Sequence, residues 1–183
     1  PADLQTAHGA RLFSALQRLK ADGVVGKIVV SVYATTEQDA LQQRFEFDLV
    51  QAPYNIIDRR LAASGWLARL HAMGTEVHAR SVFLQGLLVM PAATRPPAFR
   101  RWAGLLAAYD NWLAGERLTP VQASLRSVLS MPQISKVIVG AQSAGQLAEI
   151  LAADGPPVTA PEALSSDDRD LVDSRQADVH PLL

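Results

Sequence analysis

The sequence predicts an α/β fold in which parallel strands alternate with covering helices. Short β-branched apolar runs recur along the chain, and longer segments with helical spacing lie between them. Apolar residues fill the short runs almost without interruption, which is typical of a parallel sheet covered by helices. Four strands are expected, at residues 27–33, 47–51, 76–82 and 136–140.

Five segments carry apolar residues at intervals of three and four, which predicts helices. They are residues 10–20, 61–73, 99–113, 121–129 and 144–151. Gly74 stands where one helix should end, and Pro120 where another should begin. Residues 85–97 are long for a strand-to-helix connection, and such loops are often functional. Residues 156–183, rich in Asp, Ser and Pro, are expected to pack loosely over one face.

The composition is that of an ordinary globular protein, with 183 residues, 49% hydrophobic and 19% charged, and a net charge of -1. Such a near-neutral chain is not expected to bind nucleic acid or an anionic membrane surface. No apolar run approaches the roughly 20 residues that cross a bilayer. The absence of cysteine excludes disulfides and is compatible with a reducing compartment, so a cytoplasmic protein is expected. The four histidines lack metal-ligand spacing, so no metal site is expected.

Polar residues interrupt the apolar runs where each strand should end. Ser31, Gln51 and the pair Arg80-Ser81 close the first three runs, and Gly140 closes the fourth. Because the carboxyl ends of parallel strands meet at one edge, these groups should share the rim where α/β proteins place their chemistry. A lone Ser or Gln at a strand end is also a common turn-stabilising group, and that alternative stays open.

Gly140 is followed by small polar residues and then by a predicted helix. The absence of a Cβ lets a phosphate approach the backbone closely, and the helix start offers free amides and a positive dipole end. Many turns of this kind bind nothing. The feature alone does not decide between a phosphate site and an ordinary turn.

Strand alternation places Glu76, His78 and Arg80 on one face of the third expected strand. If that face is buried, the three side chains must pair with one another to offset the cost of burying charge. If part of that face is exposed to solvent, the three side chains are hydrated at the bottom of the barrel. The sequence leaves both arrangements open.

Five ordered segments resemble the aldo/keto reductase family. They are residues 27–33 (KIVVSVY), 50–60 (VQAPYNIIDRR), 78–88 (HARSVFLQGLL), 118–129 (LTPVQASLRSVL) and 137–151 (VIVGAQSAGQLAEIL). Their order and spacing are similar to the last four strand units of that family's (β/α)8 TIM barrel. The resemblance implies an α/β fold that is the C-terminal half of such a barrel over residues 1–155, with residues 156–183 as a C-terminal extension.

The resemblance also implies a nicotinamide cofactor, NADP with NAD as the alternative. The serine and glutamine that end two strands would hold the nicotinamide carboxamide, and the end of the next strand would pass beside the nicotinamide and pyrophosphate. The turn and helix after the last strand would bind the adenosine phosphate and adenine. In that order, the matching positions are Ser31 and Gln51; Arg80, Ser81, Val82 and Phe83; and Gly140, Gln142, Gln146 and Glu149.

Several positions depart from the family pattern. Val29 and Val32 stand where glycine and asparagine are usual, and Arg80 replaces an aromatic residue that often stacks on the nicotinamide. A guanidinium can also lie flat against a ring, so stacking is not lost by necessity. Gly140 and Gln146 stand where arginine or lysine often contacts the 2′-phosphate, which leaves NADP against NAD open.

The family's catalytic Asp, Tyr, Lys and His all belong to its first four strand units. No catalytic residue is therefore expected here, and Tyr33, Tyr54 and Tyr109 do not match the catalytic tyrosine. The start at Pro1 and the missing units predict a fragment, inactive alone, of an enzyme that reduces aldehydes or ketones by hydride transfer. Closing the barrel would require the missing first half or self-association, and the intact parent would take a small carbonyl substrate.

Three alternatives stay open. The first is a non-catalytic, nicotinamide-binding regulatory module, and the second is an inactive gene fragment. The third is a different barrel enzyme that binds phosphate without nicotinamide, because barrels commonly hold phosphate after their last two strands.

Overall fold

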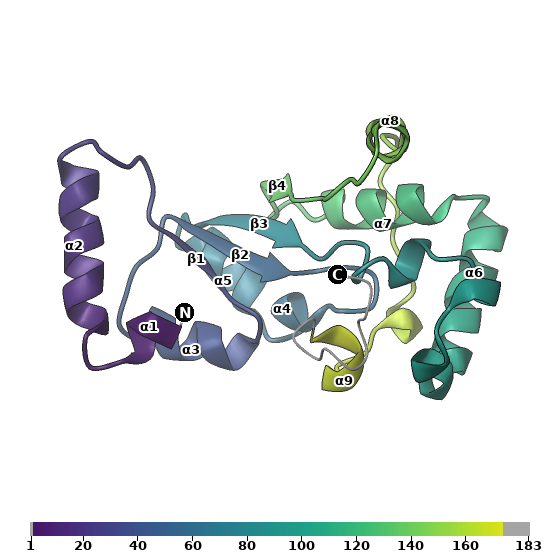
Figure 1. Cartoon of the computed structure of the whole chain (residues 1–183), viewed down its shortest axis with the longest axis horizontal. Coiled ribbons are helices and arrows are strands. Elements are labelled where there is room, and N and C mark those ends of the chain that lie inside the picture. The colour runs from purple at the N-terminus through teal and green to yellow at the C-terminus, as the bar shows by residue number, and fades with distance from the viewer. Residues whose placement is uncertain (1, 174–183) are drawn as a thin grey trace.

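The sheet at the centre of the fold has four parallel strands in the order β1-β2-β3-β4 (Figure 1). The structure is a computed structural model that describes residues 2–173. Its strands are β1 (Val29–Ser31), β2 (Leu49–Pro53), β3 (Glu76–Arg80) and β4 (Lys136–Val137). The four expected strands are therefore present and parallel. β1, β3 and β4 are shorter than expected, and β2 lies two residues further along the chain than expected.

Helices connect the strands and cover the sheet (Figure 1). The α-helices of the described residues are α1 (Ala2–Gln5), α2 (Gly9–Ala21), α3 (Thr35–Gln42), α4 (Arg60–Ala63), α5 (Trp66–Ala72), α6 (Ala103–Glu116), α7 (Pro120–Leu129), α8 (Ala144–Ala152) and α9 (Arg169–Val172). Short 3-10 helices are η1 (Leu87–Val89), η2 (Ala92–Thr94), η3 (Pro97–Trp102) and η4 (Glu162–Leu164).

Three helices differ from the expectation for physical reasons. Apolar periodicity does not predict α3, because the polar Gln38 occupies a fully buried position on that helix. Residues 61–73, expected as one helix, divide into α4 and α5 at Gly65, whose φ of 79° lies in the left-handed region that glycine tolerates. Residues 99–113 begin in the 3-10 helix η3 and become α-helical only after Trp102.

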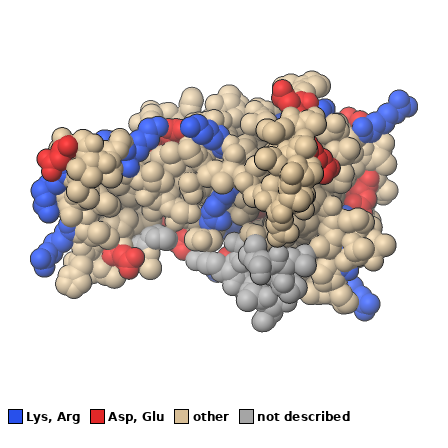
Figure 2. All heavy atoms as spheres, turned by 45° about the horizontal axis from the view of Figure 1, so that its top comes forward, with Lys and Arg blue, Asp and Glu red and all other residues tan. Residues whose placement is uncertain are grey.

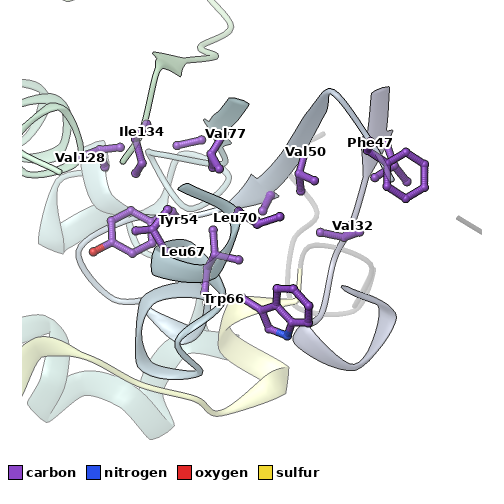
Figure 3. Packing of buried hydrophobic residues seen from close by; sticks show 14 of the residues in the cluster. Val32, Phe47, Val50, Tyr54, Trp66, Leu67, Leu70, Val77, Val128 and Ile134 are labelled. Carbon is purple, nitrogen blue, oxygen red and sulfur yellow. The ribbon is translucent and has the colours of Figure 1, made fainter. Parts of the chain in front are cut away.

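The main core lies between the sheet and α5. Val30 and Val50 are register partners, as are Val50 and Val77, and all three are almost fully buried. Leu67 and Leu70 of α5 belong to the same cluster and lie against the strands in Figure 3. Because side chains alternate along a strand, burial of this valine row turns the intervening residues to the opposite face of the sheet.

A second cluster joins the loop after β3 to α6 and the C-terminal segment. Leu164, Leu171 and Val172 are at most 3% exposed and pack in this cluster with Tyr109. The expectation that residues 156–183 pack loosely is wrong for the part up to residue 173, because these apolar side chains anchor an otherwise polar segment. Residues 174–183 lie outside the described residues.

Polar contacts hold the same segment in place. The Asp168 carboxylate accepts hydrogen bonds from Trp102 Nε1 at 3.0 Å and from Arg101 Nη2 at 2.6 Å. Closer to β2, the Arg59 Nη2 donates to the Pro161 carbonyl at 2.8 Å, and the Ser166 amide donates to the Ile57 carbonyl at 2.9 Å. The C-terminal segment is thus tied to the 3-10 helix η3 and to the loop after β2.

Glu76 and His78, the polar residues nearest the start of β3, are paired. His78 Nε2 lies 2.7 Å from Glu76 Oε1, and Lys27 also forms an ion pair with Glu76. The two hydrogen bonds hold the pKa of Glu76 at about 2, far below its ordinary value of 4.5, with Lys27 the larger cause and His78 the smaller. The structure therefore combines the two arrangements that the sequence left open. Glu76 and His78 pair with each other, but their side chains keep 20% and 12% of their surface exposed.

No helix within residues 2–173 combines the length and the apolar character needed to span a membrane.

Truncation of Leu171 tests the packing of the C-terminal segment. Leu171→Ala should lower the free energy of unfolding by about 2–5 kcal/mol, because it leaves a cavity in a fully buried site. Leu151→Ala is the matched control, because Leu151 is 71% exposed and its truncation should cost less than about 0.5 kcal/mol. Urea unfolding measures both values, and equal costs would show that the segment does not pack as described.

The Glu76 ion pairs predict a pH-dependent stability. A carboxyl group whose folded pKa is depressed stabilises the protein above its ordinary pKa, and this contribution is lost as the pH falls through the folded pKa. Glu76→Gln should therefore be less stable than the wild type at neutral pH, and the difference should shrink between pH 4.5 and about 2. Glu46→Gln is the control, because Glu46 is exposed and has no ion pair among residues 2–173. Thermal unfolding over this pH range tests the prediction, and a difference that grows on acidification would contradict it.

Candidate functional site

Ser31 ends β1 and is a neighbour of Gln51, which lies in the middle of β2 and not at its end as the sequence predicted, because β2 continues to Pro53. The parallel register pairs Ser31 with Gln51, and Gln51 with His78. All three are partly exposed and alternate with the buried valine row, so they lie on the face of the sheet opposite α5. A hydroxyl beside a primary amide offers both donors and acceptors, which is the set that a carboxamide ligand requires.

Arg80 links the ends of β3 and β1 across β2. Its Nη2 donates to the Val32 carbonyl at 2.9 Å, and its Nη1 donates to Ser81 Oγ at 3.2 Å. Its guanidinium carbon also lies 4.1 Å from the centre of the Tyr33 ring, which is the geometry of a cation–π contact. The guanidinium is therefore held in place at the rim, with one face against Tyr33.

The turn after β3 contains an unusual run of positive φ angles. Ser81, Leu84 and Gln85 have φ values of 57°, 46° and 54°, and Gly86 follows with 89°. Each non-glycine residue in this region costs about 1–3 kcal/mol, so surrounding contacts must hold the turn. Leu84 N donates to the Ser81 carbonyl at 2.9 Å, and Gln85 Nε2 donates to Ser81 Oγ at 3.4 Å. Only Gly86 signals this geometry in the sequence.

The next two predicted site residues face the protein interior. The Val82 side chain is 1% exposed and belongs to the main core, and Phe83 packs against the same core. The Val82 side chain is thus shielded from the rim, whereas Phe83 stays partly exposed.

The residues predicted to bind the adenosine end lie together at the start of α8 and on its first turns. Gly140, Gln142, Gln146 and Glu149 are all exposed. The Gln142 amide donates to Gln146 Oε1 at 2.7 Å, and the Gln146 amide donates to Ser143 Oγ at 3.2 Å. The backbone N–H groups of Gln142 and Gln146, which the sequence suggested as donors to a phosphate, therefore already donate hydrogen bonds within the chain.

Gly140 leaves open space beside the backbone. A Cβ built at this position would meet no atom within 4 Å, which is compatible with close approach of a ligand. The β4–α8 turn follows the carboxyl end of β4, so it lies at the same edge of the sheet as Ser31 and Gln51. Within the described residues no hydrogen bond joins these two parts of the rim.

The tyrosines outside the rim are structural. Tyr109 is fully buried, its hydroxyl donates to the Leu88 carbonyl at 3.1 Å, and burial raises its pKa to about 12. Tyr54 is 6% exposed, and burial likewise raises its pKa. Among residues 2–173, no group of three or more His, Asp or Glu side chains could hold a metal ion.

Two residues important to the rim were missed by the sequence reasoning, Tyr33 and Asn55. Tyr33 supplies the ring beneath Arg80, and Asn55 is 1% exposed and donates from Nδ2 to the Ser81 carbonyl at 3.0 Å. The signal for Asn55 was a lone amide in the apolar stretch that follows β2. Nothing local in the sequence points to the role of Tyr33.

Charge is mixed on the face shown in Figure 2, where basic and acidic residues are scattered over the surface. No broad region of one sign stands out there. This face offers no electrostatic footprint for a polyanion.

Three solved structures that this chain resembles in fold are aldo-keto reductases. One is aldo-keto reductase AKR11C1 from Bacillus halodurans, whose apo form has a TM-score of 0.67 at 23% identity, covering 81% of this chain and 52% of that one. Its holo form has a TM-score of 0.64 at 22% identity, covering 83% and 53%. The thermostable aldo-keto reductase Tm1743, solved with the inhibitor epalrestat, has a TM-score of 0.58 at 17% identity, covering 95% and 54%.

The chain thus spans about half the length of the solved structures that it matches. No curated protein matches its sequence. The model of the Aldo/keto reductase family matches residues 6–159, and the parallel strands with their covering helices agree with the fold of these structures. This chain belongs to the aldo/keto reductase family.

Proposed function

We propose that the chain is the cofactor-cradling, C-terminal half of a (β/α)8 barrel that reduces aldehydes or ketones with NAD(P)H. The observation that carries the proposal is the register pair Ser31–Gln51 at the same edge as the fixed Arg80–Ser81 turn. This arrangement offers hydrogen bonds for a carboxamide beside a rigid, positively charged rim.

Several features support half of a barrel. The strands lie in consecutive order, and β1 and β4 each pair on one side only within the described sheet. Val29 and Ile138, beside these outer edges, are 47% and 39% exposed. A closed barrel has no sheet edges, so a first half or a second copy of the chain would pair with β1 and β4 and cover these side chains.

The residues of this chain would hold and orient the cofactor. Ser31 and Gln51 would bind the carboxamide, and Arg80 would face the ring plane with the side that Tyr33 does not cover. Gly140 and the start of α8 would meet the adenosine end, with Gln142, Gln146 and Glu149 as contacts. The bound nicotinamide would supply a hydride to the substrate carbonyl. The acid that protonates the developing alkoxide would come from outside this chain, because Tyr54 and Tyr109 are buried and the Tyr33 ring packs against Arg80.

We propose that NADP is the preferred form of the cofactor and that NAD is the alternative. Residues 138–149 contain no lysine or arginine, so a 2′-phosphate would rely on amides and hydroxyls there. We therefore expect the chain to bind NADP only slightly more tightly than NAD. We further propose that the intact protein works in the cytoplasm, where reduced nicotinamide is supplied.

Gln51 tests the nicotinamide assignment. Gln51→Leu should weaken NADPH binding about tenfold, because a carboxamide would lose a hydrogen bond worth about 1–1.5 kcal/mol. Gln43→Leu is the matched control, because Gln43 is exposed and lies at the end of α3, away from the rim. Titration of NADPH fluorescence measures both affinities.

Adenosine 2′,5′-bisphosphate separates the two ends of the cofactor, because it lacks the nicotinamide. Its affinity should be equal in the wild type and in Gln51→Leu. Unchanged NADPH affinity in Gln51→Leu would instead favour a phosphate-binding protein that does not use nicotinamide.

Complementation tests the division of labour between the halves. The chain alone should leave NADPH unoxidised in the presence of a small aldehyde, because it contributes no acid. Addition of the first four strand units of a family member should restore NADPH oxidation if the barrel closes. Turnover by the chain alone, followed by NADPH absorbance, would contradict the assignment.

A further inference from the structure

We propose that Asn55 is a positioning residue, which sets the conformation of the Ser81 turn and through Ser81 fixes Arg80 at the rim. Its effect on the cofactor rests on the proposed function. Its effect on the turn does not, and the two can be measured separately.

The Asn55 side chain is fully committed to one orientation. Oδ1 accepts hydrogen bonds from the amides of Ile57 and Asp58 at 2.9 and 2.8 Å, and Nδ2 donates to the Ser81 carbonyl at 3.0 Å. The backbone amide of Asn55 also donates to the Asp58 carbonyl at 3.0 Å. Because two donors face the oxygen and an acceptor faces the nitrogen, a flipped amide would lose all three side-chain bonds.

This orientation joins two loops that are far apart in the sequence. The short turn 55–58 follows β2, and Ser81 follows β3. Among the described residues, Asn55 provides the hydrogen bond to the Ser81 carbonyl from outside β3 and its turn, while Leu84 provides one from within. The positive φ of Ser81 is thus supported from a neighbouring strand.

Ser81 in turn connects to Arg80. Its Oγ accepts from Arg80 Nη1 at 3.2 Å, while Arg80 Nη2 reaches the Val32 carbonyl at 2.9 Å. If Ser81 left its left-handed conformation, its Oγ would move away from the guanidinium. Asn55 therefore acts on the rim without standing at it.

Replacement of Asn55 by Asp tests this chain of contacts. The carboxylate keeps acceptors for the Ile57 and Asp58 amides but replaces the donor that faces the Ser81 carbonyl. Asn111→Asp is the matched control, since it makes the same chemical change at an exposed position of α6. If Asn55→Asp does not fold, Asn55→Ser also removes the bond to Ser81 without burying a carboxylate.

Hydrogen exchange of the Leu84 amide reports on the turn directly, because that amide donates to the Ser81 carbonyl. In Asn55→Asp its exchange should be at least about tenfold faster, while the amide of Val50 in the core strand β2 exchanges as in the wild type. Unchanged exchange at Leu84 would overturn the proposal. An equal acceleration at Val50 would also overturn it, because the substitution would then act on global stability.

Cofactor affinity is the second measurement. NADPH should bind Asn55→Asp about tenfold more weakly than wild type, and Ser81→Gly should reduce this difference, because glycine adopts a positive φ without support. A loosened turn with wild-type NADPH affinity would overturn the positioning role while leaving the proposed function intact. If the wild type binds no NADPH even after the first four strand units of a family member are added, the proposed function fails, and the exchange experiment alone decides the role of Asn55.

Discussion

The parallel register of the first three strands is the constraint on which the rest of the structure depends. Val30, Val50 and Val77 share one row and are buried against α5. The hydrophobic effect fixes that face, and because side chains alternate, it also fixes the opposite one. Ser31, Gln51 and His78 are brought together by core packing rather than by attraction for one another.

Hydrogen bonds between the strand ends then fix in detail the side chains that the strand register places only approximately. Arg80 reaches over β2 to the end of β1, and Asn55 reaches from the turn after β2 to the turn after β3. Each contact crosses between different strands, so the ends of β1, β2 and β3 are held together, while the β4–α8 turn is not joined to them by these bonds. Such cross-support is what allows Ser81 and its neighbours to keep costly backbone angles.

The elements that could be predicted from the sequence are those that periodicity and turn chemistry specify. The β-branched runs located all four strands, and Pro120 located the start of α7, where Thr119 and Gln122 form a reciprocal cap at 3.2 and 3.1 Å. The site residues could be placed at one edge because parallel strands end together. The family of the chain is confirmed by the match over residues 6–159, and the cofactor-binding roles of the site residues stay predictions.

The elements that could not be predicted depend on tertiary contacts that leave no local pattern. Gln38 is polar but fully buried, so the buried face of α3 does not appear as an apolar pattern in the sequence. The positive φ of Leu84 is imposed by the surrounding contacts, since leucine itself disfavours it. Asn55 reads in the sequence as an ordinary turn residue until Ser81 is seen beside it. The C-terminal segment reads as polar, and its three anchoring side chains gain meaning only from the cluster that receives them.

That C-terminal segment has a consequence for the way this family member could diversify. It fastens the loop after β2 through Ile57 and Arg59, and the entrance of α6 through Trp102. The loop after β2 and the helix η3 are therefore held by the same C-terminal segment, and a substitution in that segment would act on both at once. Evolution or an engineer could therefore shift both elements by substitutions in the C-terminal segment alone, without changing the strands that carry the core.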